Sequence, residues 1–216
     1  MSINIAAQTS IQFPASLAVK YQPRSIHAFC GIDKVKRVLS KFVQNPYACS
    51  FLFHGPPGVG KTSMAQAMAE EMGAEFHHLG SQKCNIETLE QVCRTCEYIP
   101  LNGGFHFILI DEIDSASKAA QLSLLSRLDS TNSPKRTVFV FTCNTLENLE
   151  PRFISRCLEL PFQSHGIAAE AARLLETIWE REAGDAEKPN FLRIVQSSKN
   201  NIRDAVNSLQ VELLNI

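Results

Sequence analysis

The sequence lacks any long hydrophobic run: apolar residues never follow one another for the about 18 positions that a membrane-spanning helix needs. It also lacks a secretory signal at its start, because residues 1–20 show neither a basic beginning nor a continuous apolar core. We therefore expect an intracellular protein, cytoplasmic or, in a eukaryote, nuclear.

An excess of charge of one sign is missing too. The 21 lysines and arginines nearly balance the 22 aspartates and glutamates, which leaves a formal net charge of −1. No global basic field marks a nucleic-acid binder, so any DNA contact must come from a local patch. A disulfide framework is not expected either, because the seven cysteines are odd in number and scattered through predicted strands and helices.

The most specific motif in the chain is a glycine-rich run that fits the pattern G-x-x-x-x-G-K-S/T: Gly55-Pro56-Pro57-Gly58-Val59-Gly60-Lys61-Thr62. Its glycines let backbone N–H groups point at phosphate oxygens, and the helix that follows turns its positive end toward the same anion. Lys61 is expected to contact the β- and γ-phosphates, and Thr62 to offer its hydroxyl to Mg²⁺. An apolar run over 49–54 and a helix that starts with Ser63 give the required order of strand, loop and helix. The sequence therefore predicts a nucleotide triphosphatase that binds ATP and Mg²⁺, with Ser63 among the nucleotide-binding residues.

Polar groups follow two further predicted strands. The apolar run over 105–110 suits a central parallel strand, and Asp111 and Glu112 follow it, where open α/β sheets bind ligands. Asp111 can hold Mg²⁺ through its water shell, and Glu112 can orient and deprotonate the attacking water; a solvated charge cluster is the alternative. Asn144 follows the predicted strand over 137–142 and can hold the lytic water, or it caps the next helix.

The segment before the first predicted helix carries the pattern K-Y-x-P-x-S/T, with a glycine within the next ten residues. By physics alone, residues 17–25 are an extended segment before a helix. The pattern resembles the opening box of the clamp-loader branch of the AAA+ ATPases, which borders the adenine pocket in that family. The resemblance implies that Tyr21 and Pro23 contact the nucleotide and makes Asn144 the family's first sensor.

Two arginines complete the resemblance. The run Ser155-Arg156-Cys157 before a strand over 158–161 is particular to clamp-loader subunits, where the arginine reaches the γ-phosphate held by the neighbouring subunit. Arg156 is thus the implied arginine finger, and Arg152 either assists it or pairs with an acid. Residues 201–210 resemble the second-sensor helix, so Arg203 is implied to contact the γ-phosphate of its own subunit, with a surface ion pair as the alternative.

The resemblance also implies DNA-backbone contacts by Lys83 and Lys118. The start of the helix predicted over 117–128 tracks primed DNA in the family, although each lysine could equally be a solvated surface residue. We expect Leu122, Leu125 and Leu128 to lie on one face of this helix.

Zinc ligation is a separate question. Cys93 and Cys96 lie one turn apart on a helix predicted over 86–98, and Cys84, His77 and His78 are nearby in the chain. Because there is no second C-x-x-C pair, both zinc binding and buried or idle thiols remain open.

The resemblance covers residues 17–214 and implies an α/β AAA+ module. The expected organisation is a flexible arm over 1–16, an ATPase domain over 17–163 with a five-stranded parallel sheet of order 5-1-4-3-2, and a three-helix lid over 164–216. It implies a ring with other AAA+ subunits that loads a sliding clamp, or a similar ring protein, onto DNA. Family members continue into a helical collar, for which this sequence leaves no room. One explanation for the missing collar is that the sequence is a fragment of a longer subunit. The other is a collarless AAA+ ATPase that remodels a helicase, recombination or mobile-element protein, or a nucleotide-dependent scaffold.

Overall fold

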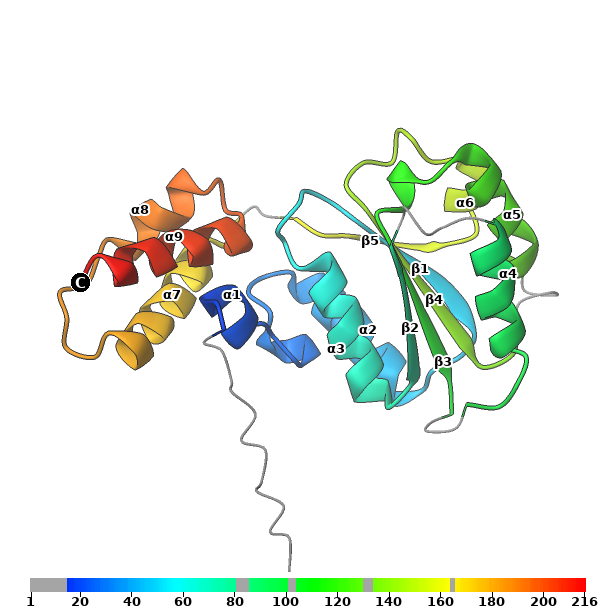
Figure 1. The fold of residues 1–216 in the computed structure, drawn as a ribbon, viewed down its shortest axis with the longest axis horizontal. Coiled ribbons are helices and arrows are strands. Elements are labelled where there is room, and N and C mark those ends of the chain that lie inside the picture. The colour runs from blue at the N-terminus through cyan, green and yellow to red at the C-terminus, as the bar shows by residue number, and fades with distance from the viewer. Residues whose placement is uncertain (1–14, 81–85, 101–103, 130–133, 164–165) are drawn as a thin grey trace, which may run out of the picture.

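The computed structural model of the chain describes residues 15–80, 86–100, 104–129, 134–163 and 166–216. A sheet with helices on both faces fills one side of the molecule, and a bundle of three helices, the lid, lies beside it (Figure 1). The strands are β1 Cys49–His54, β2 Glu75–Gly80, β3 His106–Asp111, β4 Thr137–Cys143 and β5 Leu158–Pro161. The α-helices are α1 Leu17–Lys20, α2 Asp33–Gln44, α3 Lys61–Met72, α4 Ile86–Thr95, α5 Lys118–Leu128, α6 Pro151–Ile154, α7 Ala168–Glu182, α8 Phe191–Ser197 and α9 Ile202–Leu214, with short 3₁₀ helices at Ile26–Ala28 and Ile113–Ser115.

Five strands of the described chain form one parallel sheet in the order β2-β3-β4-β1-β5. The predicted five-stranded sheet of order 5-1-4-3-2 is therefore confirmed. Strands β1, β3 and β4 are buried along almost their whole length, which explains why they are continuous apolar runs rather than alternating ones. Because all strands run the same way, the ends of β1, β3 and β4 meet at one edge of the sheet.

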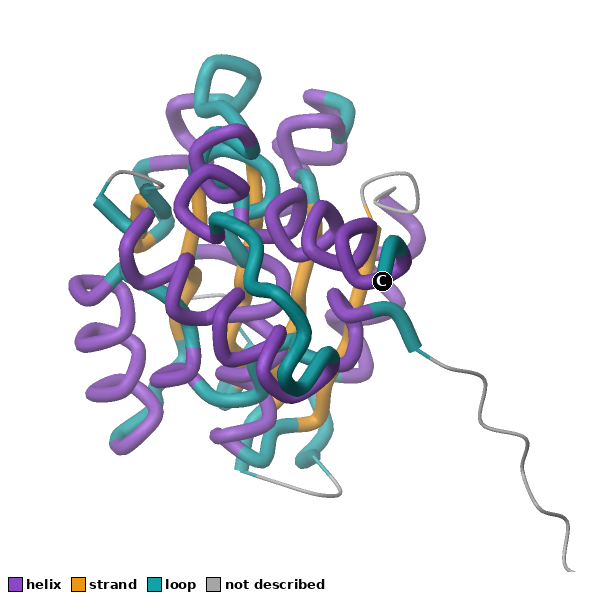
Figure 2. The backbone as a smooth tube through the Cα atoms, turned by 90° about the vertical axis from the view of Figure 1, so that its left-hand side faces the viewer, coloured by secondary structure: helices purple, strands orange, loops and turns teal. Residues whose placement is uncertain are grey.

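Each face of the sheet has its own core, because successive side chains of a strand point to opposite faces. Phe51 and Phe53 pack with the apolar sides of α2 and α3, whereas Leu52 packs with α4, α5 and the short α6. The view in Figure 2 places the strands behind the lid and between helices. No helix in the described part of the chain is long and apolar enough to cross a membrane.

The first part of the segment before α2 is helical rather than extended, contrary to the expectation for residues 17–25. It contains the short helix α1, which packs Leu17 into the lid core. The Leu17 N–H donates to Gln210 Oε1 of α9 at 3.2 Å, and the side chains of Lys20 and Tyr21 both donate to Glu182 of α7. These contacts with a distant part of the chain stabilise a turn that local sequence does not predict. Residues 1–14, most of the predicted arm, lie outside the described residues.

Helix α5 buries only part of the face on which the sequence places Leu122, Leu125 and Leu128. Leu122 is 45% exposed, whereas Leu124 is 1% exposed and shares the buried face with Ala120 and Leu128. Residues two apart are turned by about 200° around a helix, so Leu122 and Leu124 lie on opposite sides. Of the three leucines that the sequence places on one face, Leu128 is buried, Leu125 packs against the core and Leu122 is exposed. Helix α4 also ends at Thr95, three residues before the predicted end at Tyr98.

Candidate active site

The glycine-rich loop joins β1 to α3 in a conformation that depends on its glycines. Gly58 has φ +76°, and a Cβ atom there would lie 1.9 Å from the side-chain oxygen of Asn201. A Cβ atom at Gly55 would lie 2.1 Å from the carbonyl oxygen of Phe162. The loop is thus packed between the first residues of the lid helix α9 and the chain after β5, and larger residues do not fit at these two positions.

Lys61 is held inside this loop. Its ammonium group donates to the carbonyl oxygens of Gly55 at 2.7 Å and Pro56 at 2.9 Å, and to Asn144 Oδ1 at 3.0 Å. Burial lowers the pKa of Lys61, and the nearby acidic groups, among them Asp111, act in the opposite direction. A phosphate in the loop would replace some of these acceptors, and the predicted first sensor Asn144 already lies in contact with the lysine.

Asp111 and Thr62 form the pair of groups that Mg²⁺ ligation requires. Thr62 Oγ1 lies 2.9 and 3.1 Å from the two carboxylate oxygens of Asp111. Thr142 Oγ1 donates to Asp111 Oδ1 at 2.5 Å and accepts from the Glu112 N–H at 3.0 Å. A hydroxyl beside a carboxylate at a phosphate loop is the donor set that ATPases use for Mg²⁺. The residues present therefore fit this ion.

Glu112 stands out because its carboxylate is exposed and makes no hydrogen bond or ion pair with any residue that the structure describes. Its backbone is left-handed, with φ 54°, which turns the chain out of β3. Asp114, two residues later, accepts from the N–H groups of Asn144 at 3.0 Å and Thr145 at 3.4 Å. Asp114 thereby positions the loop that carries Asn144.

A cavity of about 580 Å³ opens beside these residues. This volume is typical of a site for a small molecule. Among its lining residues, Tyr21, Pro23, Gly58, Thr62, Ser63 and Arg203 were predicted from the sequence, whereas Gln22, Arg24, Cys30, Leu174, Ile202 and Val206 were not. The walls come from three regions, namely the segment around α1, the glycine-rich loop with α3, and the lid.

Arg203 lines the lid side of the cavity. Its side chain is exposed and forms no hydrogen bond or ion pair with another described residue, so the surface ion pair weighed as an alternative is not present there. Asn201, at the start of the same helix, accepts from the Asp204 N–H at 3.2 Å and caps α9. Sequence reasoning missed the second role of Asn201, its contact with Gly58.

Arg156 does not belong to this cavity. Its Nε lies 2.5 Å from Asp129 Oδ1, and its Nη1 donates to the Arg152 carbonyl oxygen at 2.8 Å. Lys118 is also outside the cavity and pairs with Glu150 at 3.4 Å. Lys83 lies outside the described residues. Among the described residues, the structure thus brings together the predicted nucleotide and magnesium residues but not Arg156 or Lys118.

Some residues missed by sequence reasoning carry a recognisable signal. Thr142 is the last-but-one residue of β4, and the register pairs Ile110 of β3 with Phe141 of β4. A hydroxyl at the end of the strand beside the acidic one was therefore visible in the sequence. Arg24 follows Pro23 of the opening box and lines the cavity as an exposed cation.

Residues 51–163, just over half of the chain, match the sequence model of the family described as "ATPase family associated with various cellular activities (AAA)". The chain belongs to this AAA family of ATPases. The predicted P-loop ATPase class, with its nucleotide binding, is thereby confirmed.

Among curated proteins, this AAA chain is similar to subunits of replication factor C. It is 28% identical over 201 residues to the small subunit from Methanothermobacter thermautotrophicus. This alignment covers 88% of the chain and 61% of the relative. It is 26% identical over 213 residues to human replication factor C subunit 4. This alignment covers 91% of the chain and 58% of the relative. The predicted resemblance to the clamp-loader branch is confirmed. The chain spans about three fifths of the length of these relatives.

Among solved structures, the AAA chain resembles the Holliday junction branch migration motor RuvB of Thermotoga maritima. The TM-score is 0.72 at 22% identity, and the match covers 88% of the chain and 64% of the motor protein. At this identity the likeness concerns the fold alone. It confirms the α/β AAA+ architecture.

Proposed function

We propose that the chain hydrolyses ATP as one subunit of a clamp-loader-like ring that loads a sliding clamp, or a similar ring protein, onto DNA. The observation that carries the proposal is the contact between the Thr62 hydroxyl and the Asp111 carboxylate, which both line a cavity of about 580 Å³. The similarity to replication factor C subunits supports the clamp-loading role. Such work would take place in the cytoplasm or, in a eukaryote, in the nucleus.

The chain's own groups divide the work at the phosphates. Backbone N–H groups of residues 55–60 and the start of α3 receive the phosphate oxygens, and Lys61 exchanges carbonyl acceptors for them. Thr62 and Asp111 would hold Mg²⁺, which supplies charge neutralisation between the β- and γ-phosphates. Glu112, whose carboxylate has no hydrogen-bond or ion-pair partner among the described residues, accepts the proton of the attacking water, and Asn144 orients that water.

The lid contributes Arg203 to the same cavity. An exposed cation with no partner among the described residues is available for the γ-phosphate, and its distance to that group changes when the lid moves. We infer that Arg203 reports which nucleotide is bound. The base lies between the α1 segment, with Tyr21 and Pro23, and the lid residues Ile202 and Val206.

Arg156 acts on the site of a neighbouring subunit in this proposal. It lies outside its own cavity and is held near the end of α5 by Asp129. An arginine beyond its own site serves a catalytic role when a second subunit presents a nucleotide to it. The proposal therefore requires a ring of subunits.

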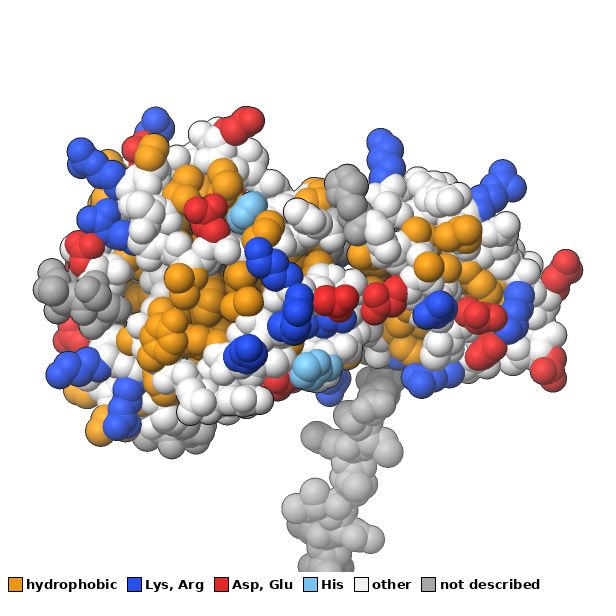
Figure 3. Space-filling model, turned by 180° about the vertical axis from the view of Figure 1, so that it is seen from behind, with side chains coloured by type: hydrophobic (Ala, Val, Ile, Leu, Met, Phe, Trp, Pro, Cys, Tyr) orange, Lys and Arg blue, Asp and Glu red, His pale blue; other side chains and the backbone are white. Residues whose placement is uncertain are grey.

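DNA would be contacted locally and through its backbone. In Figure 3, basic and acidic side chains lie interspersed over one face, and several basic ones gather near its middle with acidic ones beside them. With a net charge of −1, only a few cations can face phosphates. Lys118, whose side chain is 79% exposed, is one candidate, and Lys83 is the other.

The test is nucleotide-dependent binding to the sliding clamp of the source organism. We expect co-precipitation of the purified chain with the clamp in ATP and much less in ADP, and none with Lys61→Ala, which lacks the phosphate-binding lysine. Absence of clamp binding by a wild-type chain that binds ATP would contradict clamp loading. Remodelling of a helicase, recombination or mobile-element protein would then be the better explanation.

A further inference from the structure

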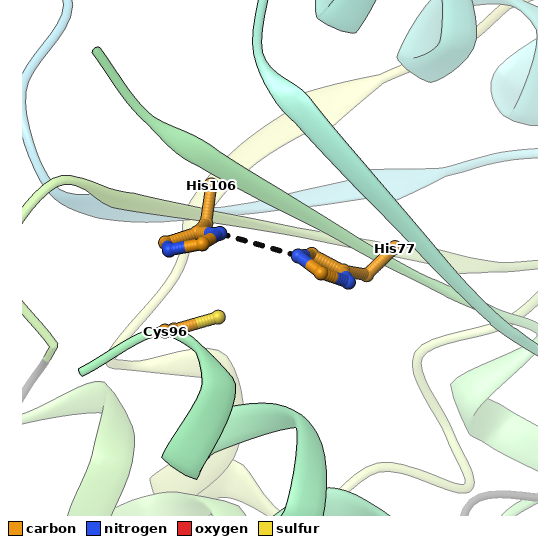
Figure 4. Close-up of side chains that lie close together, drawn as sticks. All are labelled: His77, Cys96 and His106. Carbon is orange, nitrogen blue, oxygen red and sulfur yellow. Dashed lines mark hydrogen bonds between the residues drawn. The ribbon is translucent and has the colours of Figure 1, made fainter. Parts of the chain in front are cut away.

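Three metal-ligating side chains from three elements meet at the end of the sheet opposite the nucleotide cavity. They are His77 of β2, His106 of β3 and Cys96, which directly follows α4 (Figure 4). Their ligand atoms all lie within 4.8 Å of one another. His106 begins β3 and Asp111 ends it, so about 17 Å of strand separates these two residues, at about 3.3 Å per residue; His77 is in register with Ile108, three residues before Asp111.

The cluster is buried, and its histidines have defined hydrogen-bond roles. Cys96 and His106 are each 1% exposed, and His77 is half-buried. His106 Nε2 lies 2.9 Å from the Tyr98 carbonyl oxygen, which can only accept, so Nε2 carries the proton. The lone pair of His106 Nδ1 therefore faces His77 Nε2, 3.2 Å away. A backbone carbonyl that fixes the tautomer in this way is the usual partner of a metal-bound histidine.

A carboxylate and a hydroxyl lie beside these three side chains. Glu75 Oε1 is 3.8 Å from His77 Nε2, and Glu75 Oε2 is 3.8 Å from His106 Nδ1. Burial raises the pKa of the Cys96 thiol to about 12, and the neighbouring Thr137 hydroxyl acts in the opposite direction. That hydroxyl is fully buried and has no partner of ordinary hydrogen-bond geometry among the described residues.

We propose that His77, Cys96 and His106 bind one Zn²⁺ ion, with Glu75 as the fourth ligand. Two imidazoles and a thiolate are ligands that zinc prefers. On a tetrahedral zinc ion two nitrogens lie about 3.3 Å apart, and a nitrogen and a sulfur about 3.6 Å apart. The two histidine nitrogens already have this spacing. Since no two of these ligand atoms are more than 4.8 Å apart, the cysteine sulfur needs to move closer by about 1.2 Å at most, through rotation of its side chain. The Glu75 carboxylate, at 3.8 Å from each histidine nitrogen, needs to move closer by about half an ångström.

This site differs from the cysteine cluster weighed from the sequence. Cys93 is buried in the core under α4 and is not part of the cluster, and Cys84 lies outside the described residues. His78 points to the other face of β2 and lies 3.9 Å from Asp111 instead. The ion would join the end of α4 to the first residues of β2 and β3. It would therefore stabilise the sheet domain rather than take part in ATP hydrolysis.

The experiment uses the untagged full chain, reduced and freed of metal with a chelator, and titrated with Zn²⁺ in the absence of nucleotide. We expect one equivalent to bind with a nanomolar or tighter dissociation constant, as structural zinc sites do. At a hundredfold excess over that constant the Tm should rise by about 5–10 °C. Co²⁺ in place of Zn²⁺ should give intense visible bands of tetrahedral geometry and a thiolate-to-cobalt charge-transfer band in the near ultraviolet.

Zinc binding by substituted chains shows which side chains are ligands of the ion. Cys96→Ala and His77→Ala should each weaken zinc binding about a hundredfold or more, and Cys96→Ala should remove the charge-transfer band. Cys93→Ala, a buried thiol one helical turn away, is the matched control and should bind as the wild type does. Asp111→Ala should also bind normally, which separates this ion from any at the nucleotide site.

Two results would overturn the proposal. One is zinc binding that is no tighter in the wild type than in Cys96→Ala, because His77 and His106 would then be only a hydrogen-bonded pair. The other is a wild-type cobalt spectrum without thiolate charge transfer. The spectrum decides the question even if Cys96→Ala fails to fold, since it reads sulfur ligation in the unaltered chain.

Discussion

Replacing Arg156 by alanine should abolish ATP turnover in an assembled ring and leave folding almost unchanged. Within its own chain, Arg156 is paired with Asp129, and the two side chains are 31% and 42% exposed. Water screens such a pair, so its loss costs at most about 1 kcal/mol of folding free energy. An arginine finger contributes about 10³–10⁵ in rate, which corresponds to about 4–7 kcal/mol of transition-state stabilisation. The two roles differ enough to be separated by measurement.

Three measurements on Arg156→Ala test this difference. For a domain of this size, a loss of about 1 kcal/mol lowers the Tm by about 2–4 °C. ATP affinity should stay near that of the wild type, because the side chain does not line its own cavity. The kcat for ATP under assembling conditions should fall at least about 10³-fold. Arg127→Ala is the matched control, since Arg127 forms a similarly exposed ion pair with Glu97 at 3.8 Å and should retain turnover.

Mixing two inactive variants decides which subunit the arginine serves. Lys61→Ala subunits lack the phosphate-binding lysine but keep Arg156, and Arg156→Ala subunits bind ATP but lack the finger. When the two co-assemble, some interfaces combine an intact phosphate site with an intact arginine, so part of the activity should return. A mixture that co-assembles and stays inactive would refute action in trans. Loss of turnover by Arg156→Ala in a chain shown to be monomeric would refute it as well.

Four further outcomes test the site and its surroundings. Glu112→Gln should keep ATP affinity and lower kcat by about 10²–10⁴, because the base is lost while the phosphate-binding residues remain; a comparable loss of affinity in binding titrations would contradict this role. Lys61→Ala should lose ATP affinity itself in the same titrations. Thr142→Val removes a buried hydroxyl bonded to the Asp111 carboxylate and should cost about 1.5–3 kcal/mol in thermal unfolding, and it should raise the Mg²⁺ concentration needed for turnover. Lys118→Ala should reduce the slope of log affinity for primed DNA against log salt by about one, and an unchanged slope would remove this lysine from the interface.

The strands could be predicted from the sequence because their signal is local. Continuous apolar runs between turn residues mark strands buried on both faces, and β1 at Cys49–His54 has the predicted bounds. The short helix α1 could not be predicted, since its four residues are too few to be stable alone. It is held by contacts with Glu182 and Gln210, more than 160 residues away in the chain.

Some residues of the nucleotide site could be predicted from local sequence in the same way, and others could not. The glycine-rich loop and Asp111 carry their chemistry in short contiguous motifs, so sequence reasoning finds them. Thr142 and Asp114 act through hydrogen bonds between neighbouring strands and loops, which depend on the register of β3 and β4. The cluster of His77, Cys96 and His106 is harder still to predict from the sequence. It draws on three elements, and sequence reasoning named Cys96 and His77 among its zinc candidates but missed His106. His106 lies 29 residues after His77 in the chain, and the pairing of β2 with β3 brings the two together.

The α1 segment connects the two halves of the nucleotide cavity. On the lid side, Lys20 is ion-paired with Glu182 at 2.7 Å. On the other side, Gln22 Nε2 donates to the side-chain oxygens of Ser63 at 3.2 Å and Gln66 at 2.8 Å, both on α3. All these contacts are between exposed polar groups and are individually weak, whereas the lid itself is built around buried apolar side chains. The polar contacts of the α1 segment therefore join the lid to α3 beside the nucleotide cavity, together with the Gly31 N–H, which donates to Glu170 of lid helix α7 at 2.8 Å.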